Sequence, residues 1–222
     1  MLKKEHLKIY LVYLLFISGG ILHLFNLFQT VMQVSTSPLL IAVSLFLIYD
    51  IAKSIHHLYQ MRFLLWSLFV ILFGLGIEYI GVSTHFPFGR YIYGSVLQPQ
   101  LFQIPLAIGF SWLTICLSSL ILATRIVNLY HIKKLHYKYI IPFFTAAFML
   151  IFDVVMEHAA QKLDYWTWEN HIVPHQNYLS WFLLGLLFTY VWLRLKLSIN
   201  ANLSFGIHVY LAQLIYFILV LL

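Results

Sequence analysis

The sequence is poor in cysteine and in charge, and each shortage removes a class of protein. Its single cysteine, Cys116, excludes a disulfide framework. Charged residues make up only 9% of the 222 residues, whereas 62% are hydrophobic. The mean hydropathy is +0.89. A soluble domain does not have this composition, so the chain is predicted to be an integral membrane protein of the cell membrane.

Motifs for common cofactors are also missing from the sequence. His56, His57, His131 and His136 follow no HxxHH pattern, so they are too few and too scattered for a membrane di-iron oxygenase. The last apolar run has no lysine that could hold retinal as a Schiff base. No internal repeat or pair of broken helices indicates a secondary transporter. We therefore expect no metal and no other cofactor.

Apolar runs dominate what is present. A hydrocarbon core is about 30 Å thick, and runs long enough to cross it lie near residues 8–30, 38–52, 63–82, 101–124, 139–160, 177–193 and 204–222. The first run lacks a cleavage site and reads as a retained span. The stretch from Val31 to Pro38 is expected to be a short turn. The predicted fold is all-α, a polytopic membrane helix bundle of about seven transmembrane helices, with residues 1–222 forming one integral-membrane domain.

The positive charges predict how this bundle is oriented. Arg90 and Lys162 lie on one side of it, and the other side holds the remaining eleven of the thirteen basic residues: Lys3, Lys4, Lys8, Lys53, Arg62, Arg125, Lys133, Lys134, Lys138, Arg194 and Lys196. Because positive charge is retained in the cytoplasm, the N-terminus is expected to be cytoplasmic. The net charge of +6 then reflects topology, and nothing indicates a nucleic-acid partner.

Ionisable groups converge at one depth of the predicted bundle. At a rise of about 1.5 Å per residue, His23, Glu78 and Asp153 each lie roughly 20 Å from the cytoplasmic end of their span. Glu157 follows Asp153 by one turn on the same face. A charge inside a membrane is costly unless it is paired or protonated, so such residues indicate a functional site.

Structural explanations for two of these groups stay open. Gly19, His23 and Asn26 share a helical face, which suits either a polar inward surface or a simple contact between helices. Glu78 is followed by a loop that contains Arg90, and the two side chains could form a structural ion pair.

The fifth span leads directly into a cluster of aromatic residues. Asp153 and Glu157 are close enough that one of the two carboxyls is expected to hold a proton. Tyr165, Trp166 and Trp168 follow in the next connection. An interfacial aromatic belt explains one tryptophan better than it explains a cluster beside two acids.

These residues resemble a known family. Glu78 precedes the segment Thr84-His-Phe-Pro-Phe-Gly-Arg-Tyr-Ile-Tyr93, and a helix with Asp153 and Glu157 runs into Trp166-Thr-Trp168. This order is similar to that of the carotenoid biosynthesis family of membrane carotenoid hydratases, of the gamma-carotene and bisanhydrobacterioruberin hydratase type. The resemblance is strongest from the third span to the sixth. The chain departs from the pattern at His85, where a glycine is usual, and at Glu157-His158, which replaces an Asp-Pro-like pair.

The resemblance implies an acyclic carotenoid as substrate, with membrane lipid and other carotenoid-pathway enzymes as surroundings. We expect a cofactor-independent hydratase in which Asp153 donates a proton to a terminal C=C and Glu78 holds the water or stabilises the cation. Glu157 and His23 would resupply protons. The expected substrate contacts are His23, Asn26, Thr84, Phe86, Phe88, Arg90, Tyr91, Tyr93, Tyr165, Trp166 and Trp168. The alternatives are an end-group cyclase or isomerase, a carotenoid carrier, and a proton-coupled transporter.

Overall fold

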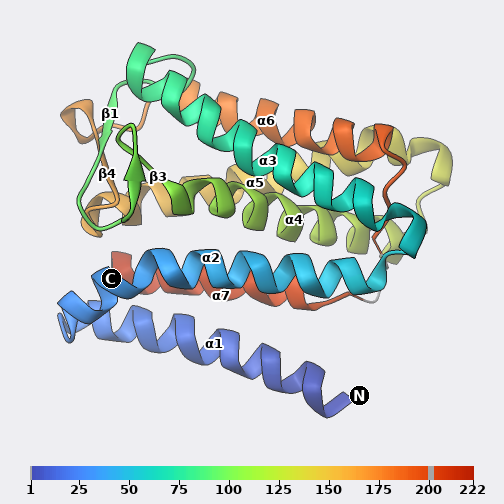
Figure 1. The fold of residues 1–222 in the computed structure, drawn as a ribbon, viewed down its shortest axis with the longest axis horizontal. Coiled ribbons are helices and arrows are strands. Elements are labelled where there is room, and N and C mark those ends of the chain that lie inside the picture. The colour runs from blue at the N-terminus through green and yellow to red at the C-terminus, as the bar shows by residue number, and fades with distance from the viewer. Residues whose placement is uncertain (1, 200–202) are drawn as a thin grey trace.

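The computed structural model describes residues 2–199 and 203–222, and it describes side chains from His6 onward, except that of Lys134. The predicted basic side chains of Lys3, Lys4 and Lys134 therefore lie outside the described part. Seven α-helices make up most of the described chain: α1 (Leu2–Leu24), α2 (Gln29–Ser54), α3 (His57–Thr84), α4 (Leu106–Leu129), α5 (Tyr137–Lys162), α6 (His175–Arg194) and α7 (Phe205–Leu221) (Figure 1). The all-helical bundle predicted from the apolar runs is thus present.

The helices differ in how well they suit a membrane. Within the described residues, five of them, α1 to α5, are long and apolar enough to cross it. Helix α7 is apolar but has only 17 residues, and α6 is not one of the five. The chain therefore has the character of a membrane protein, and five of the seven predicted spans meet the criteria of length and composition.

The predicted turn from Val31 to Pro38 is wrong. Helix α1 ends at Leu24, the turn occupies residues 25–28, and α2 continues through Pro38. The hydroxyls of Ser35 and Thr36 donate to the carbonyl of Met32 at 3.1 and 2.8 Å, so these turn-forming residues are satisfied inside the helix. The second span is consequently a long one.

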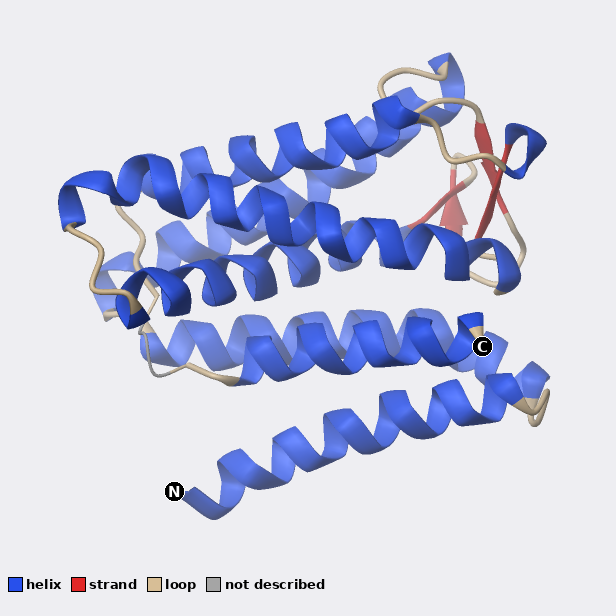
Figure 2. Ribbon diagram, turned by 180° about the vertical axis from the view of Figure 1, so that it is seen from behind, coloured by secondary structure: helices blue, strands red, loops and turns tan. Residues whose placement is uncertain are grey.

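The two ends of the bundle have different characters. One end, here called the ribbon end, carries all the short strands, the turn between α1 and α2, and the C-terminus (Figures 1 and 2). The opposite end, the basic end, carries the N-terminus and the connections that follow α2, α4 and α6. Basic residues lie at this end as the sequence predicted: those with described side chains are Lys8, Lys53, Arg62, Arg125, Lys133, Lys138, Arg194 and Lys196.

Helix α4 lies at the centre of the bundle. In Figure 1, α4 and α5 form the middle layer. Helices α3 and α6 lie above this layer, and α2 and α7 lie below it. Helix α1 is outermost, below α2 and α7. Helix α1 packs mainly along α7, where Gly20 meets Leu219: a Cβ built on this glycine would lie 2.8 Å from two carbons of that side chain. Small residues permit such close helix approach in membranes.

Two antiparallel two-stranded ribbons at the ribbon end were not predicted from the sequence. Strand β1 (Tyr91–Tyr93) pairs with β4 (Trp166–Trp168), and β2 (Gln100–Leu101) pairs with β3 (Ile104–Pro105). In the first ribbon Tyr91 lies opposite Trp168, and Tyr93 lies opposite Trp166. Side chains alternate along a strand, so the aromatic residues of Tyr-x-Tyr and Trp-x-Trp share one face. Ile92 points the other way and is 68% exposed.

Candidate active site

A cavity of about 290 Å³ lies under the inner face of the β1–β4 ribbon and reaches between the helices. Its polar groups include the carboxyls of Glu78 and Glu157 and the side-chain amides of Asn177 and Gln213. Aromatic residues form a large part of its wall: Phe16, Phe88, Tyr91, Tyr93, Trp112, Phe152, Tyr165, Trp166, Trp168, Trp181, Tyr216 and Phe217. A largely apolar cavity with a few convergent polar groups is the usual form of a small-molecule site.

Glu78 on α3 is buried and fully hydrogen-bonded. Its Oε1 accepts the indole N–H of Trp112 at 2.9 Å. Its Oε2 accepts the hydroxyl of Tyr93 at 2.7 Å and also that of Tyr91. Three donors aimed at one carboxyl suit the ionised form, because charge-assisted hydrogen bonds are the strong ones.

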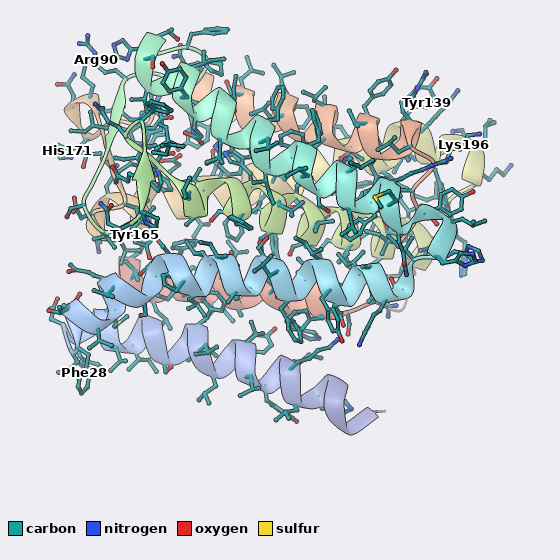
Figure 3. The ribbon with its side chains drawn as sticks, viewed as in Figure 1. Phe28, Arg90, Tyr139, Tyr165, His171 and Lys196 are labelled. Atoms are coloured by element: carbon teal, nitrogen blue, oxygen red, sulfur yellow. The ribbon has the colours of Figure 1, made fainter. Side chains whose placement is uncertain are left out.

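The alternative in which Glu78 pairs with Arg90 is wrong. Arg90 instead forms an ion pair with Glu169 at 3.0 Å, and both side chains are more than half exposed. Figure 3 shows Arg90 at the ribbon end, pointing away from the bundle. The carboxyl of Glu78 is therefore held by neutral donors and not by a cation.

The two tyrosines that contact Glu78 are kept protonated. Burial, together with the nearby carboxyl of Glu78, raises the pKa of both Tyr91 and Tyr93 well above the ordinary tyrosine value. They remain hydrogen-bond donors at any physiological pH. This fixes the direction of their hydrogen bonds toward the acid.

Glu157 and Asp153 on α5 form the second acidic group. The Oε2 of Glu157 accepts the indole N–H groups of Trp166 at 2.7 Å and Trp168 at 2.6 Å. The side-chain amide of Asn177, on α6, donates to Glu157 Oε1 at 3.2 Å and to Asp153 Oδ2 at 3.0 Å. The Oδ1 of Asp153 is buried and has no hydrogen-bond partner among the described residues.

The two acids of α5 have different access to the cavity. Glu157 lines the wall, whereas Asp153 is fully buried behind it and is not among the wall residues. Glu157 has three N–H donors and Asp153 has one. The donors therefore favour the ionised form of Glu157 more than that of Asp153.

Aromatic rings stack tightly beside the acids. Trp112 and Trp181 are stacked with their ring centroids 3.9 Å apart, and Phe88 stacks on Trp112 at 6.2 Å. Tyr91 and Trp168 approach to 4.9 Å across the ribbon. The faces of such rings attract positive charge, so this wall can stabilise a cation.

Two glycines of α3 allow this close packing around Glu78. A Cβ on Gly81 would lie 2.8 Å from the ring of Phe88 and 3.0 Å from the hydroxyl oxygen of Tyr91. A Cβ on Gly74 would lie 2.9 Å from the indole of Trp112. The donors of Glu78 thus depend on the absence of side chains at these two positions.

The structure brings together only part of the predicted site. Phe88, Tyr91, Tyr93, Tyr165, Trp166 and Trp168 line the cavity with Glu78 and Glu157. The structure does not place the remaining predicted contacts on its wall: His23, Asn26, Thr84, Phe86 and Arg90.

Besides Arg90, which pairs with Glu169, the other four of these residues have different surroundings. Asn26 is exposed in the turn after α1, where its φ is 55°, so it does not share a helical face with Gly19 and His23. His23 packs edge-on against Tyr216. Thr84 donates its hydroxyl to the carbonyl of Ile80, and Phe86 is 71% exposed beside it.

Several wall residues were missed from the sequence. Gln213 lies in the middle of apolar α7, and the rule that singled out the buried acids would have found it. Asn177 is the third residue of α6, in a polar first turn that does not mark it as buried. Trp112, Trp181 and Tyr216 come from three different helices, and no local pattern marks them. Their role depends on how those helices pack.

The fold and the cavity define a helical membrane protein with a carboxyl site in an aromatic pocket. The chain belongs to the carotenoid biosynthesis protein family, whose model matches residues 24–222. It is 27% identical over 118 residues to a bisanhydrobacterioruberin hydratase of Haloarcula japonica, an alignment that covers 51% of this chain and 39% of the relative. The aligned part is thus less than half of the relative's length. No solved structure matches the chain. The family predicted from the sequence is confirmed.

Proposed function

We propose that the protein is a carotenoid hydratase, which adds water across the terminal C=C of an acyclic carotenoid to leave a tertiary hydroxyl. The observation that carries the proposal is the pair of carboxyls, Glu157 and Glu78, on the wall of one aromatic cavity. Membership of a carotenoid biosynthesis family and the name of the relative support the substrate class.

The first step is transfer of a proton to the alkene. Asp153 and Glu157 share one proton, which rests on Asp153 and reaches the substrate through Glu157, because only Glu157 borders the cavity. The O–H bond of Glu157 breaks, a C–H bond forms at the less substituted alkene carbon, and the positive charge moves to the tertiary carbon. Proton transfer by a positioned acid contributes about 10²–10⁴-fold to a rate.

The second step is capture of the cation by water. The rings of Trp112, Trp181 and Phe88 stabilise the cation while water approaches. Water forms the C–O bond and passes one proton to Glu78. Glu78 acts as the base, because its three hydrogen-bond donors favour the ionised carboxylate. Return of this proton through cavity water to the Asp153–Glu157 pair completes the cycle.

This assignment makes Glu157 the direct proton donor, whereas the depth of the residues in the membrane would suggest Asp153. Counting along the helix favours Asp153 as the donor, because it is the deeper of the two. The cavity wall favours Glu157 as the catalytic residue that touches the alkene. Asp153 then acts through Glu157 as a positioning residue that stores the proton.

A cyclase is the second candidate, because the same aromatic wall would protect a cation that is captured by an internal alkene. Mass separates the two candidates: hydration adds one water, whereas cyclisation changes the spectrum and leaves the mass unchanged. The test is expression in a bacterium that makes lycopene or diapolycopene, followed by mass spectrometry of the pigments. Bound pigment without any new product would instead identify a carrier.

The source of the new oxygen tests the mechanism. We expect oxygen-18 from labelled water to enter the product, and membranes should remain active without dioxygen. Loss of activity on removing dioxygen or chelating iron would contradict acid-catalysed hydration and favour an oxygenase.

A further inference from the structure

The cavity opens sideways between α1 and α2. Leu15, Ser18 and Leu22 on α1 face Val31, Ser35 and Leu39 on α2, and all six line the cavity. These six residues are here called the lateral slot. Leu15, Ser18, Val31 and Ser35 are exposed although they border the cavity, so the slot connects the interior with the surface of the bundle.

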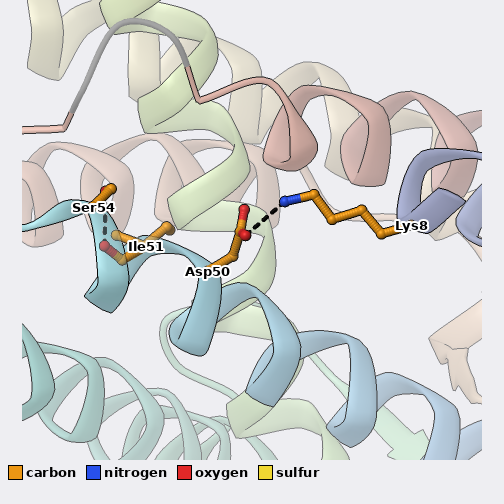
Figure 4. Close-up of polar contacts among 4 residues, drawn as sticks. All are labelled: Lys8, Asp50, Ile51 and Ser54. Atoms are coloured by element: carbon orange, nitrogen blue, oxygen red, sulfur yellow. Dashed lines mark hydrogen bonds and ion pairs between the residues drawn. The ribbon is translucent and has the colours of Figure 1, made fainter. Parts of the chain in front are cut away.

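The slot has a closed frame. At the ribbon end, the turn of residues 25–28 joins the two helices. At the basic end, Lys8 of α1 and Asp50 of α2 form an ion pair at 2.6 Å with both side chains largely buried (Figure 4). Between these points α1 packs mainly on α7, where Tyr13 bonds His208 at 3.2 Å. The two helices are therefore joined at both ends of the slot, while between these points α1 packs on α7 rather than on α2.

The slot carries no charge and lies between two apolar helices. Both of its helices are among those long and apolar enough to cross a membrane. Four of its residues are aliphatic, and the hydroxyls of Ser18 and Ser35 donate to carbonyls of their own helices. The slot thus offers an apolar surface that leads from the bilayer to the acids.

We propose that the lateral slot is a binding subsite for the long unsubstituted arm of the polyene, which stays in the bilayer while the reactive end enters the cavity. The proposal rests on the proposed function. A cavity of about 290 Å³ accommodates the end of a carotenoid but not the whole molecule, so the rest must leave by an apolar opening. Helix α1, one wall of the slot, lies almost entirely before residue 24, where the family match begins.

Substitutions that fill the slot test the proposal. Ser18→Trp and Ser35→Trp block it from its two sides, and Leu14→Trp and Val34→Trp are matched controls at exposed positions that do not line the cavity. Each variant is assayed in lipid nanodiscs with lycopene and with a short acyclic isoprenoid that ends in the same trisubstituted alkene. The slot variants should lose at least about tenfold of kcat/KM on lycopene, since remote binding energy contributes to turnover. The kcat/KM of the slot variants on the short substrate should stay within about twofold of wild type. The kcat/KM of both control variants should do so on either substrate.

A reversible variant covers the case in which a tryptophan disturbs folding. Ser35→Cys is labelled after purification with a bulky thiol reagent that reductant removes, and the native Cys116 is fully buried. Labelling should abolish turnover of lycopene, and reduction should restore it. Equal lycopene turnover before and after labelling would overturn the slot.

The two proposals fail in different ways. If the unmodified protein hydrates neither substrate, the proposed function is wrong, and the slot is then judged by how much lycopene remains bound after purification. Retention in the wild type and in Val34→Trp but not in Ser35→Trp would support the slot, and equal retention in all three would overturn it.

Discussion

Asp153 and Glu157, one helical turn apart on α5, accept hydrogen bonds from the same group, the side-chain amide of Asn177 on α6. One amide thus holds two acids in a fixed relation. Only Glu157 also receives indole donors and borders the cavity. The division of labour proposed for the acids follows from this asymmetry.

Glu157→Gln should reduce turnover by at least about a hundredfold, the low end for loss of general acid catalysis. The amide keeps the shape of the side chain but cannot deliver the proton. Product is measured by mass spectrometry against the amount of protein in the membrane. Glu169→Gln, the same change at an exposed position of the ribbon end, is the control and should be near wild type. Full activity of Glu157→Gln would mean that this acid is structural.

Asp153→Asn should lower kcat, leave KM unchanged and alter the pH profile. Without the neighbouring acid, Glu157 must take its proton from solvent, so the residual rate should rise as the pH falls. A merely structural role for Asp153 would reduce the amount of folded protein and leave the profile of the remaining enzyme unchanged. The measurement is kcat across the pH range in nanodiscs.

Tyr91 and Tyr93 should resist ionisation in the folded protein, because burial and the carboxyl of Glu78 raise the pKa of both. The unfolded chain would lose these protons near the ordinary value of 10.0. Their contribution to stability is therefore complete below pH 10 and is lost as the pH rises above it. The free energy of unfolding, measured by chemical unfolding at pH 9 and pH 11, should fall less between these pH values in Tyr91→Phe than in the wild type. An equal loss in both would contradict the raised pKa.

Gly81→Ala should impair catalysis without unfolding the protein. The added methyl displaces Phe88 and the hydroxyl of Tyr91, so Glu78 loses a donor that is worth about 1.5–3 kcal/mol when the acceptor is charged. We expect a loss of turnover of about tenfold or more, measured on lycopene. Gly76→Ala on the same helix is the matched control, since a Cβ there meets nothing within 4 Å. Equal activity of the two variants would show that the donor is dispensable.

Much of the fold could be predicted because the apolar runs are long and the basic residues fall at one end. The helix boundaries were less accessible: Ser35, Thr36 and Pro38 form turns in most proteins, but here the hydroxyls bond back to Met32 and the helix continues. The positions of single transmembrane acids were easier to interpret, because the cost of burying a carboxyl is independent of the fold.

The site could be predicted only where its signal is local in sequence. Tyr91 and Tyr93 in one loop, and Trp166 and Trp168 in another, could be chosen because each pair follows a buried acid closely in sequence; the ribbon that aligns them could not. Trp112 and Trp181 become neighbours only when α4 packs beside α6, which no local pattern specifies. The motif predicts that Arg90 contacts the substrate, yet Arg90 pairs at the surface with Glu169, which lies far along the chain.

The register of the β1–β4 ribbon has a consequence for building chimaeras with related proteins. Tyr91, which donates to Glu78, lies directly opposite Trp168, which donates to Glu157. A loop transplanted alone would bring one strand of the ribbon to a foreign partner and would misplace the donors of both acids at once. A chimaera that exchanges residues 85–105 should therefore stay active only when residues 163–174 are taken from the same parent. The two loops must be exchanged together.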